Sequence, residues 1–110
     1  MGRSQDPNQR FVTAYEIEIT PEAEHEISEI VQWYTAQDRR AAETFKTIVF
    51  DSVDLISHSP LSWAQVSDDG VRRFVLPRYP YKLFFTVMGD TVKILAVAHN
   101  RRMPGYWRKN

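Results

Sequence analysis

The apolar residues of this chain change their spacing once, and that change restricts the fold more than any other feature. Between residues 21 and 57 they recur every three or four positions, which is the spacing of an amphipathic α-helix. From residue 71 to residue 98 they alternate with polar residues or form short β-branched and aromatic runs, as strands do. Helices followed by a run of strands predict an α+β fold.

Two helices are predicted in the first half. Thr20 and Pro21 mark a helix start, because a threonine hydroxyl caps free backbone amides and proline suits the first helical position. The first helix carries its apolar stripe on Ala23, Ile27, Ile30, Val31 and Tyr34. The second runs from about residue 39 to residue 57 and ends before Pro60, which cannot continue it. Because few residues separate them, the helices are expected to form an antiparallel hairpin.

Four strands are predicted, one before the helices and three after them. They cover residues 15–19, 71–76, 81–88 and 91–98. The pair Gly89-Asp90 is typical of a two-residue hairpin turn between the last two. The expected architecture is a helical hairpin packed on a mostly antiparallel four-stranded sheet, in the order β-α-α-β-β-β.

Length and composition favour a single small domain. The chain has 110 residues, of which 43% are hydrophobic, enough to fill one core. Residues 1–11 resemble vector-derived sequence left by cloning, so residues 12–110 are expected to form the domain. The absence of cysteine excludes a disulfide framework and a thiol nucleophile. No apolar run reaches membrane-spanning length and no signal-peptide pattern is present, so we expect a cytoplasmic protein without a membrane partner.

The formal charge of zero hides a strong asymmetry. Residues 15–70 carry twelve acidic and three basic side chains, whereas residues 71–110 carry nine basic side chains and one acidic. Such a division predicts a basic surface that meets an anionic partner. The alternative is that two acidic helices simply flank a sheet with basic edges.

Neither a metal nor a cofactor is expected. The three histidines, His25, His58 and His99, lie far apart on different predicted elements, with no carboxylate at ligand spacing. The four glycines are isolated, which excludes a glycine-rich phosphate loop.

Chemistry-bearing residues gather in the last forty positions. Arg72 and Arg73 lie on one predicted strand, and His99 ends another. If neighbouring strands bring these groups to one surface, the arginines can hold a phosphate and the histidine can move a proton, as cleavage of RNA at its own 2′-hydroxyl requires. Alternatively, the arginines form salt bridges with an acidic partner and the histidine makes a hydrogen bond at the strand end. Both interpretations stay open on the residues alone.

Three stretches of sequence resemble a known superfamily. They are residues 72–76 (RRFVL), 79–85 (YPYKLFF) and 94–102 (ILAVAHNRR), the last followed by Pro-Gly-Tyr-Trp at 104–107. With the Thr-Pro-Glu-Ala helix start and the Trp-Tyr pair at 33 and 34, they resemble the RelE/ParE superfamily, the toxins of bacterial type II toxin–antitoxin modules. The likeness covers residues 15–107.

The superfamily implies two different activities. RelE-like members are metal-independent, ribosome-dependent mRNA endoribonucleases, whereas ParE-like members poison DNA gyrase without cleaving nucleic acid. In a nuclease, Arg73 or Arg72 would hold the phosphate and His99 would be the acid or base. This chain departs from the nucleases in its pI of about 6.8 and in lacking a lysine pair or glutamate before Arg72. Its His-x-Arg-Arg ending resembles ParE, so we favour gyrase inhibition over the nuclease alternative and over a non-toxic interaction domain.

The resemblance also implies a partner, a ParD-like antitoxin whose disordered tail folds over the toxin. Promoter DNA would be bound by that antitoxin and not by this chain. The predicted apolar anchors are Trp33, Phe50 and Leu55, although core packing is the alternative for the aromatic residues. The predicted partners of acidic side chains on the tail are Arg72, Arg73, Arg78, Arg101 and Arg102. The predicted contacts with the target are Arg101, Arg102, Tyr106, Trp107 and Arg108.

Overall fold

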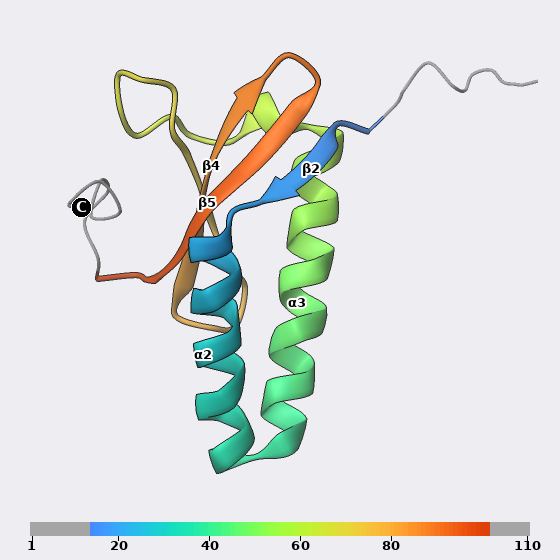
Figure 1. Ribbon diagram of the computed structural model, residues 1–110, viewed down its shortest axis with the longest axis vertical. Coiled ribbons are helices and arrows are strands. Elements are labelled where there is room, and N and C mark those ends of the chain that lie inside the picture. The colour runs from blue at the N-terminus through green and yellow to red at the C-terminus, as the bar shows by residue number, and fades with distance from the viewer. Residues whose placement is uncertain (1–13, 102–110) are drawn as a thin grey trace, which may run out of the picture.

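The structure is a computed structural model that describes residues 14–101 of the chain. Its elements are β2 (Glu16–Ile19), α2 (Pro21–Gln37), α3 (Arg39–His58), the short 3₁₀ helix η1 (Pro60–Ser62), β3 (Arg72–Val75), β4 (Tyr81–Met88) and β5 (Thr91–His99). The predicted order β-α-α-β-β-β is confirmed (Figure 1). The segment 1–11, assigned to cloning, lies outside the described residues.

Both helices begin at the side-chain caps that their sequences offer. The Thr20 hydroxyl accepts a hydrogen bond from the backbone N–H of Ala23 at 3.1 Å and donates one to the Leu95 carbonyl at 3.2 Å. Asp38 ends α2 by donating its N–H to the Tyr34 carbonyl at 2.7 Å, and its side chain caps α3 by accepting from the Arg40 N–H at 2.9 Å. One residue therefore turns the chain from the first helix into the second.

The sheet is mixed, with strand order β2-β5-β4-β3. The three later strands form an antiparallel meander, as predicted, and β2 joins it in parallel beside β5, with Glu16 opposite Thr91 and Ile19 opposite Ile94. Gly89 lies in the turn between β4 and β5 with φ of +59°, a backbone conformation that residues with a Cβ atom rarely adopt. The register shifts once, between Phe84 and Phe85.

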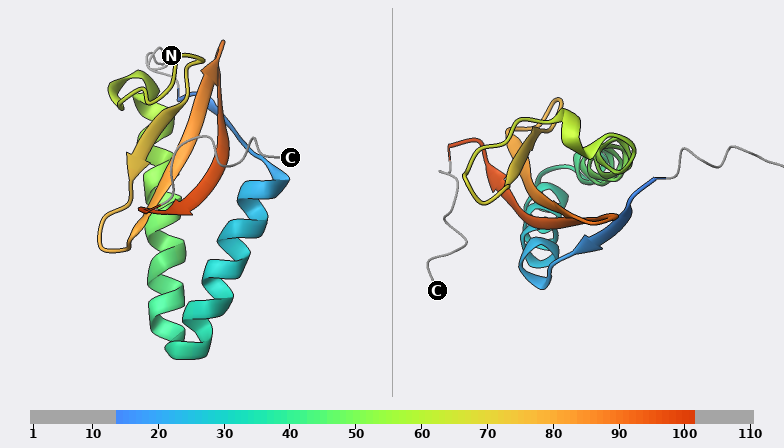
Figure 2. Two further views of the ribbon diagram at one scale, coloured as in Figure 1. Left: turned by 90° about the vertical axis from the view of Figure 1, so that its left-hand side faces the viewer. Right: turned by 90° about the horizontal axis from the view of Figure 1, so that it is seen from above.

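The hairpin of α2 and α3 covers one face of the sheet, and its connected end projects beyond the strands (Figures 1 and 2). Phe45, Ile48 and Ile56 of α3 pack with Leu83 and Phe85 of β4 and Ile94 of β5 in the main core. Burying each such side chain contributes roughly 1.5–3 kcal/mol, so this interface supplies most of the fold's apolar stabilisation. No helix within residues 14–101 is both long and apolar enough to cross a membrane.

The opposite face of the sheet, called the outer face below, has a smaller apolar cluster of its own. Val71, Phe84, Ala96 and Ala98 are buried there, and Val66 of the loop before β3 packs on them. The loop is tied to β3 because the Ala64 carbonyl accepts from the Arg73 N–H at 2.9 Å and Val66 donates to the Val71 carbonyl at 2.7 Å. A chain segment outside the named strands thus extends the sheet past β3.

Candidate functional site

Arg72 and Arg73 point to opposite faces of the sheet. In the antiparallel pairing of β3 with β4, Arg72 lies opposite Phe85 and Arg73 lies opposite Phe84. Phe85 belongs to the core under the helices, whereas Phe84 belongs to the cluster on the outer face. Because directly opposed residues share a face, Arg72 is on the helix side and Arg73 on the outer face.

Arg72 is used to hold the loop before β3. Its Nη1 donates to the Trp63 carbonyl at 2.7 Å and lies 3.4 Å from the Leu61 carbonyl. The Trp63 ring in turn packs edge-on against Phe74 at 4.6 Å between centroids. These contacts show that the half-buried Arg72 guanidinium stabilises the loop. It is therefore less available to acidic side chains of a partner than predicted from the sequence.

Arg73 shares the outer face with Lys82, which was not among the predicted site residues. Lys82 lies on β4 and is buried, with 7% of its surface exposed. Its Nζ donates to the Asn100 carbonyl at 2.8 Å and stands 5.6 Å from the centre of the Phe84 ring. Burial, and then the charge of Arg73, lower the pKa of Lys82 from its usual range. The signal in the sequence was a lone cation inside an aromatic strand, two positions before Phe84.

His99 ends β5 on the helix side. It lies opposite Tyr81, whose ring it meets edge-on at 5.6 Å, and its Nδ1 accepts the Arg101 N–H at 3.2 Å. Tyr81 itself packs on Phe45 of the core, so His99 and Arg73 face opposite ways. The expectation that Arg72, Arg73 and His99 share one surface is therefore wrong, because strand alternation separates the two arginines and the pairing of β5 turns the histidine away from Arg73.

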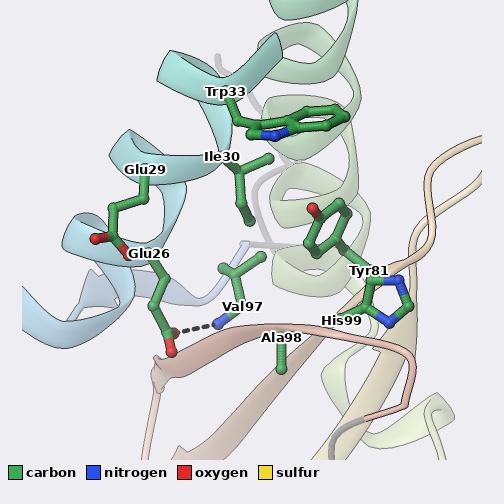
Figure 3. Close-up of a pocket in the computed structure, with 8 residues that line it drawn as sticks. All are labelled: Glu26, Glu29, Ile30, Trp33, Tyr81, Val97, Ala98 and His99. Atoms are coloured by element: carbon green, nitrogen blue, oxygen red, sulfur yellow. Dashed lines mark hydrogen bonds between the residues drawn. The ribbon is translucent and has the colours of Figure 1, made fainter.

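A cavity of about 300 Å³ lies between α2 and the end of β5. Figure 3 shows the Trp33 indole at one end and Val97 with Ala98 at the other, while Tyr81 and His99 line one side and two glutamates of α2 the opposite side. One of these, Glu26, accepts the Val97 N–H at 2.8 Å. The other, Glu29, has an exposed side chain whose Oε2 lies 3.2 Å from Nε2 of His25. Trp33 is 58% exposed, which excludes core packing as its role.

A second, apolar groove of about 470 Å³ lies on the other side of the hairpin, between β2, α2 and α3. Ile17, Ile27, Val49 and Val53 line it, together with Phe50, which is 74% exposed. Leu55 is also exposed but lines neither cavity. The three predicted apolar anchors therefore belong to different surfaces: Trp33 beside β5, Phe50 in the groove beside β2, and Leu55 elsewhere on α3.

The remaining predicted contact residues are only partly covered by the structure. Arg78 is exposed in the turn before β4 with φ of +71°, and Arg101 is exposed just after β5. The predicted positions Arg102, Tyr106, Trp107 and Arg108 lie outside the described residues. Within residues 14–101 no group of three or more histidine or carboxylate side chains could hold a metal ion.

A solved structure described as the chromosomal ParDE TA system from P. aeruginosa matches this chain with a TM-score of 0.70 and 20% sequence identity, over 78% of this chain and 96% of that one. This likeness supports the fold. No curated protein matches the sequence. A family model described as "ParE toxin of type II toxin-antitoxin system, parDE" matches residues 17–104, which is most of the chain. The chain thus belongs to the ParE toxin family of type II toxin–antitoxin systems.

Proposed function

We propose that this toxin stops growth by inhibiting DNA gyrase in the cytoplasm and that a cognate ParD-like antitoxin neutralises it. The observation that carries the proposal is the family match across residues 17–104. The positions of both arginines agree with it, because a nuclease of the RelE type needs its phosphate-binding cation and its proton-transferring group around one phosphodiester. Arg73 faces away from His99, and Arg72, which is on the helix side as His99 is, donates to the Trp63 carbonyl.

Purified toxin, gyrase and relaxed plasmid test the proposed target. We expect supercoiling to fall and gyrase-cleaved DNA to accumulate as toxin is added, and premixed antitoxin should restore supercoiling. Unchanged supercoiling at a molar excess of toxin would contradict gyrase inhibition. New cuts in ribosome-bound mRNA, abolished by Arg73→Ala or His99→Ala, would instead assign the nuclease function, and unaffected growth on expression without antitoxin would assign a non-toxic interaction domain.

The target contact is proposed to include Arg101 and the basic and aromatic residues predicted with it, Arg102, Tyr106, Trp107 and Arg108. Arg101 is exposed beside the end of β5, and no carboxylate of residues 14–101 forms a salt bridge with it. Arg101→Glu should therefore abolish gyrase inhibition. Arg40→Glu, the same charge change at the start of α3, is the matched control and should leave inhibition intact. Equal inhibition by both variants and the parent chain would exclude Arg101 from the contact.

The antitoxin is proposed to cover the groove beside β2 and the cations Arg73, Arg78, Arg101 and Arg102. Phe50 of α3 lines that groove and is mostly exposed to solvent. An apolar side chain of the antitoxin bound in the groove would bury this exposed surface. Phe50→Ser should weaken antitoxin binding at least tenfold while gyrase inhibition persists. Leu61→Ser in η1 is the control, because Leu61 is also exposed and lines neither cavity. If both substitutions weaken binding equally, the groove is not the antitoxin site.

A further inference from the structure

The cavity between α2 and the end of β5 has an unusual lining. Two aromatic rings, Tyr81 and His99, stand across from two carboxylates, Glu26 and Glu29, and the Trp33 indole closes one end (Figure 3). No lysine or arginine of residues 14–101 lines it, and the whole of α2 carries neither. Ring faces and carboxylates both attract positive charge.

Two backbone groups of β5 beside the cavity are already hydrogen-bonded to side chains of α2 and its N-cap. The pairing of β2 with β5 ends at Ile94, and α2 continues along that edge. Thr20 donates its hydroxyl to the Leu95 carbonyl, and Glu26 accepts the Val97 N–H. A partner strand therefore cannot pair with β5 at Leu95 and Val97. A partner can instead be recognised through a side chain that enters the cavity.

We propose that this cavity binds a positively charged side chain, best an arginine, supplied by a partner polypeptide. A planar guanidinium can stack against the exposed Trp33 indole and direct its N–H groups to the carboxylate side of the cavity. The cavity volume of about 300 Å³ is at the lower limit of the ~300–1,000 Å³ range of pockets that bind drug-sized molecules. The cavity therefore suits a single side chain better than a larger ligand. The proposal rests on the proposed function only in taking the antitoxin as the partner that supplies the side chain.

The cavity can be tested with small probes that need neither antitoxin nor gyrase. The full ¹⁵N-labelled chain is titrated with acetyl-arginine-methylamide and with its neutral isostere acetyl-citrulline-methylamide, and the Trp33 indole N–H, assigned with Trp33→Phe, is followed by NMR. We expect the arginine probe to shift that signal with at least about fivefold higher affinity than the citrulline probe, in line with cation–π attraction at a partly exposed site. Equal affinities, or no shift with either probe, would overturn the proposal.

Two variants on α2 separate a specific site from general attraction to an acidic helix. Glu26→Gln keeps an oxygen that accepts the Val97 N–H but removes the charge, so arginine affinity should fall at least about threefold. Glu24→Gln, also on α2 but away from the cavity lining, should leave it unchanged. Equal losses in both variants would contradict a site. Spermidine binding more tightly than the arginine probe would assign the cavity to a free polyamine and overturn the assignment to a polypeptide.

Because these probes do not require toxicity, the outcome is independent of the gyrase and growth assays. A toxin without effect on gyrase can still bind the arginine probe, and an active toxin can fail to bind it. In the purified toxin–antitoxin complex the Trp33 signal should already be shifted and should no longer respond to the arginine probe. A signal that still responds in the complex would show that the antitoxin does not fill the cavity.

Discussion

Arg72 and Arg73 are adjacent in the chain and have different tasks. Arg72 bonds the Trp63 carbonyl and fixes the loop before β3, whereas Arg73 stands exposed on the outer face beside the buried Lys82. The alternation of β3 already separates the two side chains in the sequence. The loop carbonyl that Arg72 binds, nine residues away along the chain, could not be identified, because it depends on how an irregular segment folds back on the strand.

Replacing Arg72 and replacing Arg73 should have different effects on the stability of the protein. Arg72→Ala should lower the free energy of unfolding by about 1–2 kcal/mol, because it leaves the Trp63 carbonyl without its charged donor. Arg73→Ala removes a like charge near Lys82 and should be neutral within about 0.5 kcal/mol or slightly stabilising. Urea unfolding of both variants measures the difference. Equal losses would show that Arg72 does not hold the loop.

Tyr34 makes the fold sensitive to alkaline pH. Burial, followed by the charges of Tyr81 and Tyr79, raises the pKa of its hydroxyl above the usual 10.0. A raised pKa in the folded state contributes stability that is fully present below pH 10 and is lost as pH rises through the folded-state value. Tyr34→Phe should therefore lose less stability than the parent chain above pH 10. Parallel pH profiles of the melting temperature would contradict this role.

At the scale of elements, local sequence signals define the helices and strands well. They do not define which of these elements lie side by side in the fold. Thr20, Pro21 and Pro60 marked the helix ends, and side-chain spacing marked the strands, because these depend on residues close in sequence. The parallel placement of β2 beside β5 depends on which sheet edge is free after the meander forms, and no short motif encodes it. The cavity at Trp33 was missed for the same reason, since its lining comes from α2, β4 and β5.

Thr20 joins two elements and should be the most sensitive cap. Its hydroxyl caps α2 and also bonds β5 through the Leu95 carbonyl. Thr20→Val removes both bonds at similar volume and should cost about 1–2 kcal/mol of unfolding free energy. Thr47→Val is the matched control, because that hydroxyl is exposed and donates within α3 to the Glu43 carbonyl. Equal melting temperatures for the two variants would exclude a joining role for Thr20.

At the scale of the whole molecule, charge is divided along the chain. The acidic residues concentrate in 15–70, which includes the hairpin, and the basic residues in 71–110. This division was visible in the sequence, but the placement of Arg73 and Lys82 on the outer face, away from the acidic helix α2, follows only from the pairing of the strands.

Antitoxin association should depend on ionic strength. We expect the association rate constant to fall about tenfold between ~50 mM and ~500 mM salt, because steering between opposite charges is screened. Arg73→Gln should reduce that dependence, whereas Arg40→Gln, far from the outer face, should not. Stopped-flow measurement of binding gives both slopes. A rate that does not change with salt would contradict charge-guided recognition of the outer face.

The pairing of Glu16 with Thr91 and of Ile19 with Ile94 has a consequence for the timing of synthesis. A ribosome that has not yet made residues 91–94 carries a nascent chain in which β2 lacks its partner strand, so the sheet closes only after β5 has been synthesised. Products of translation interrupted before residue 91 should therefore not fold into active toxin, and they should be harmless to the cell.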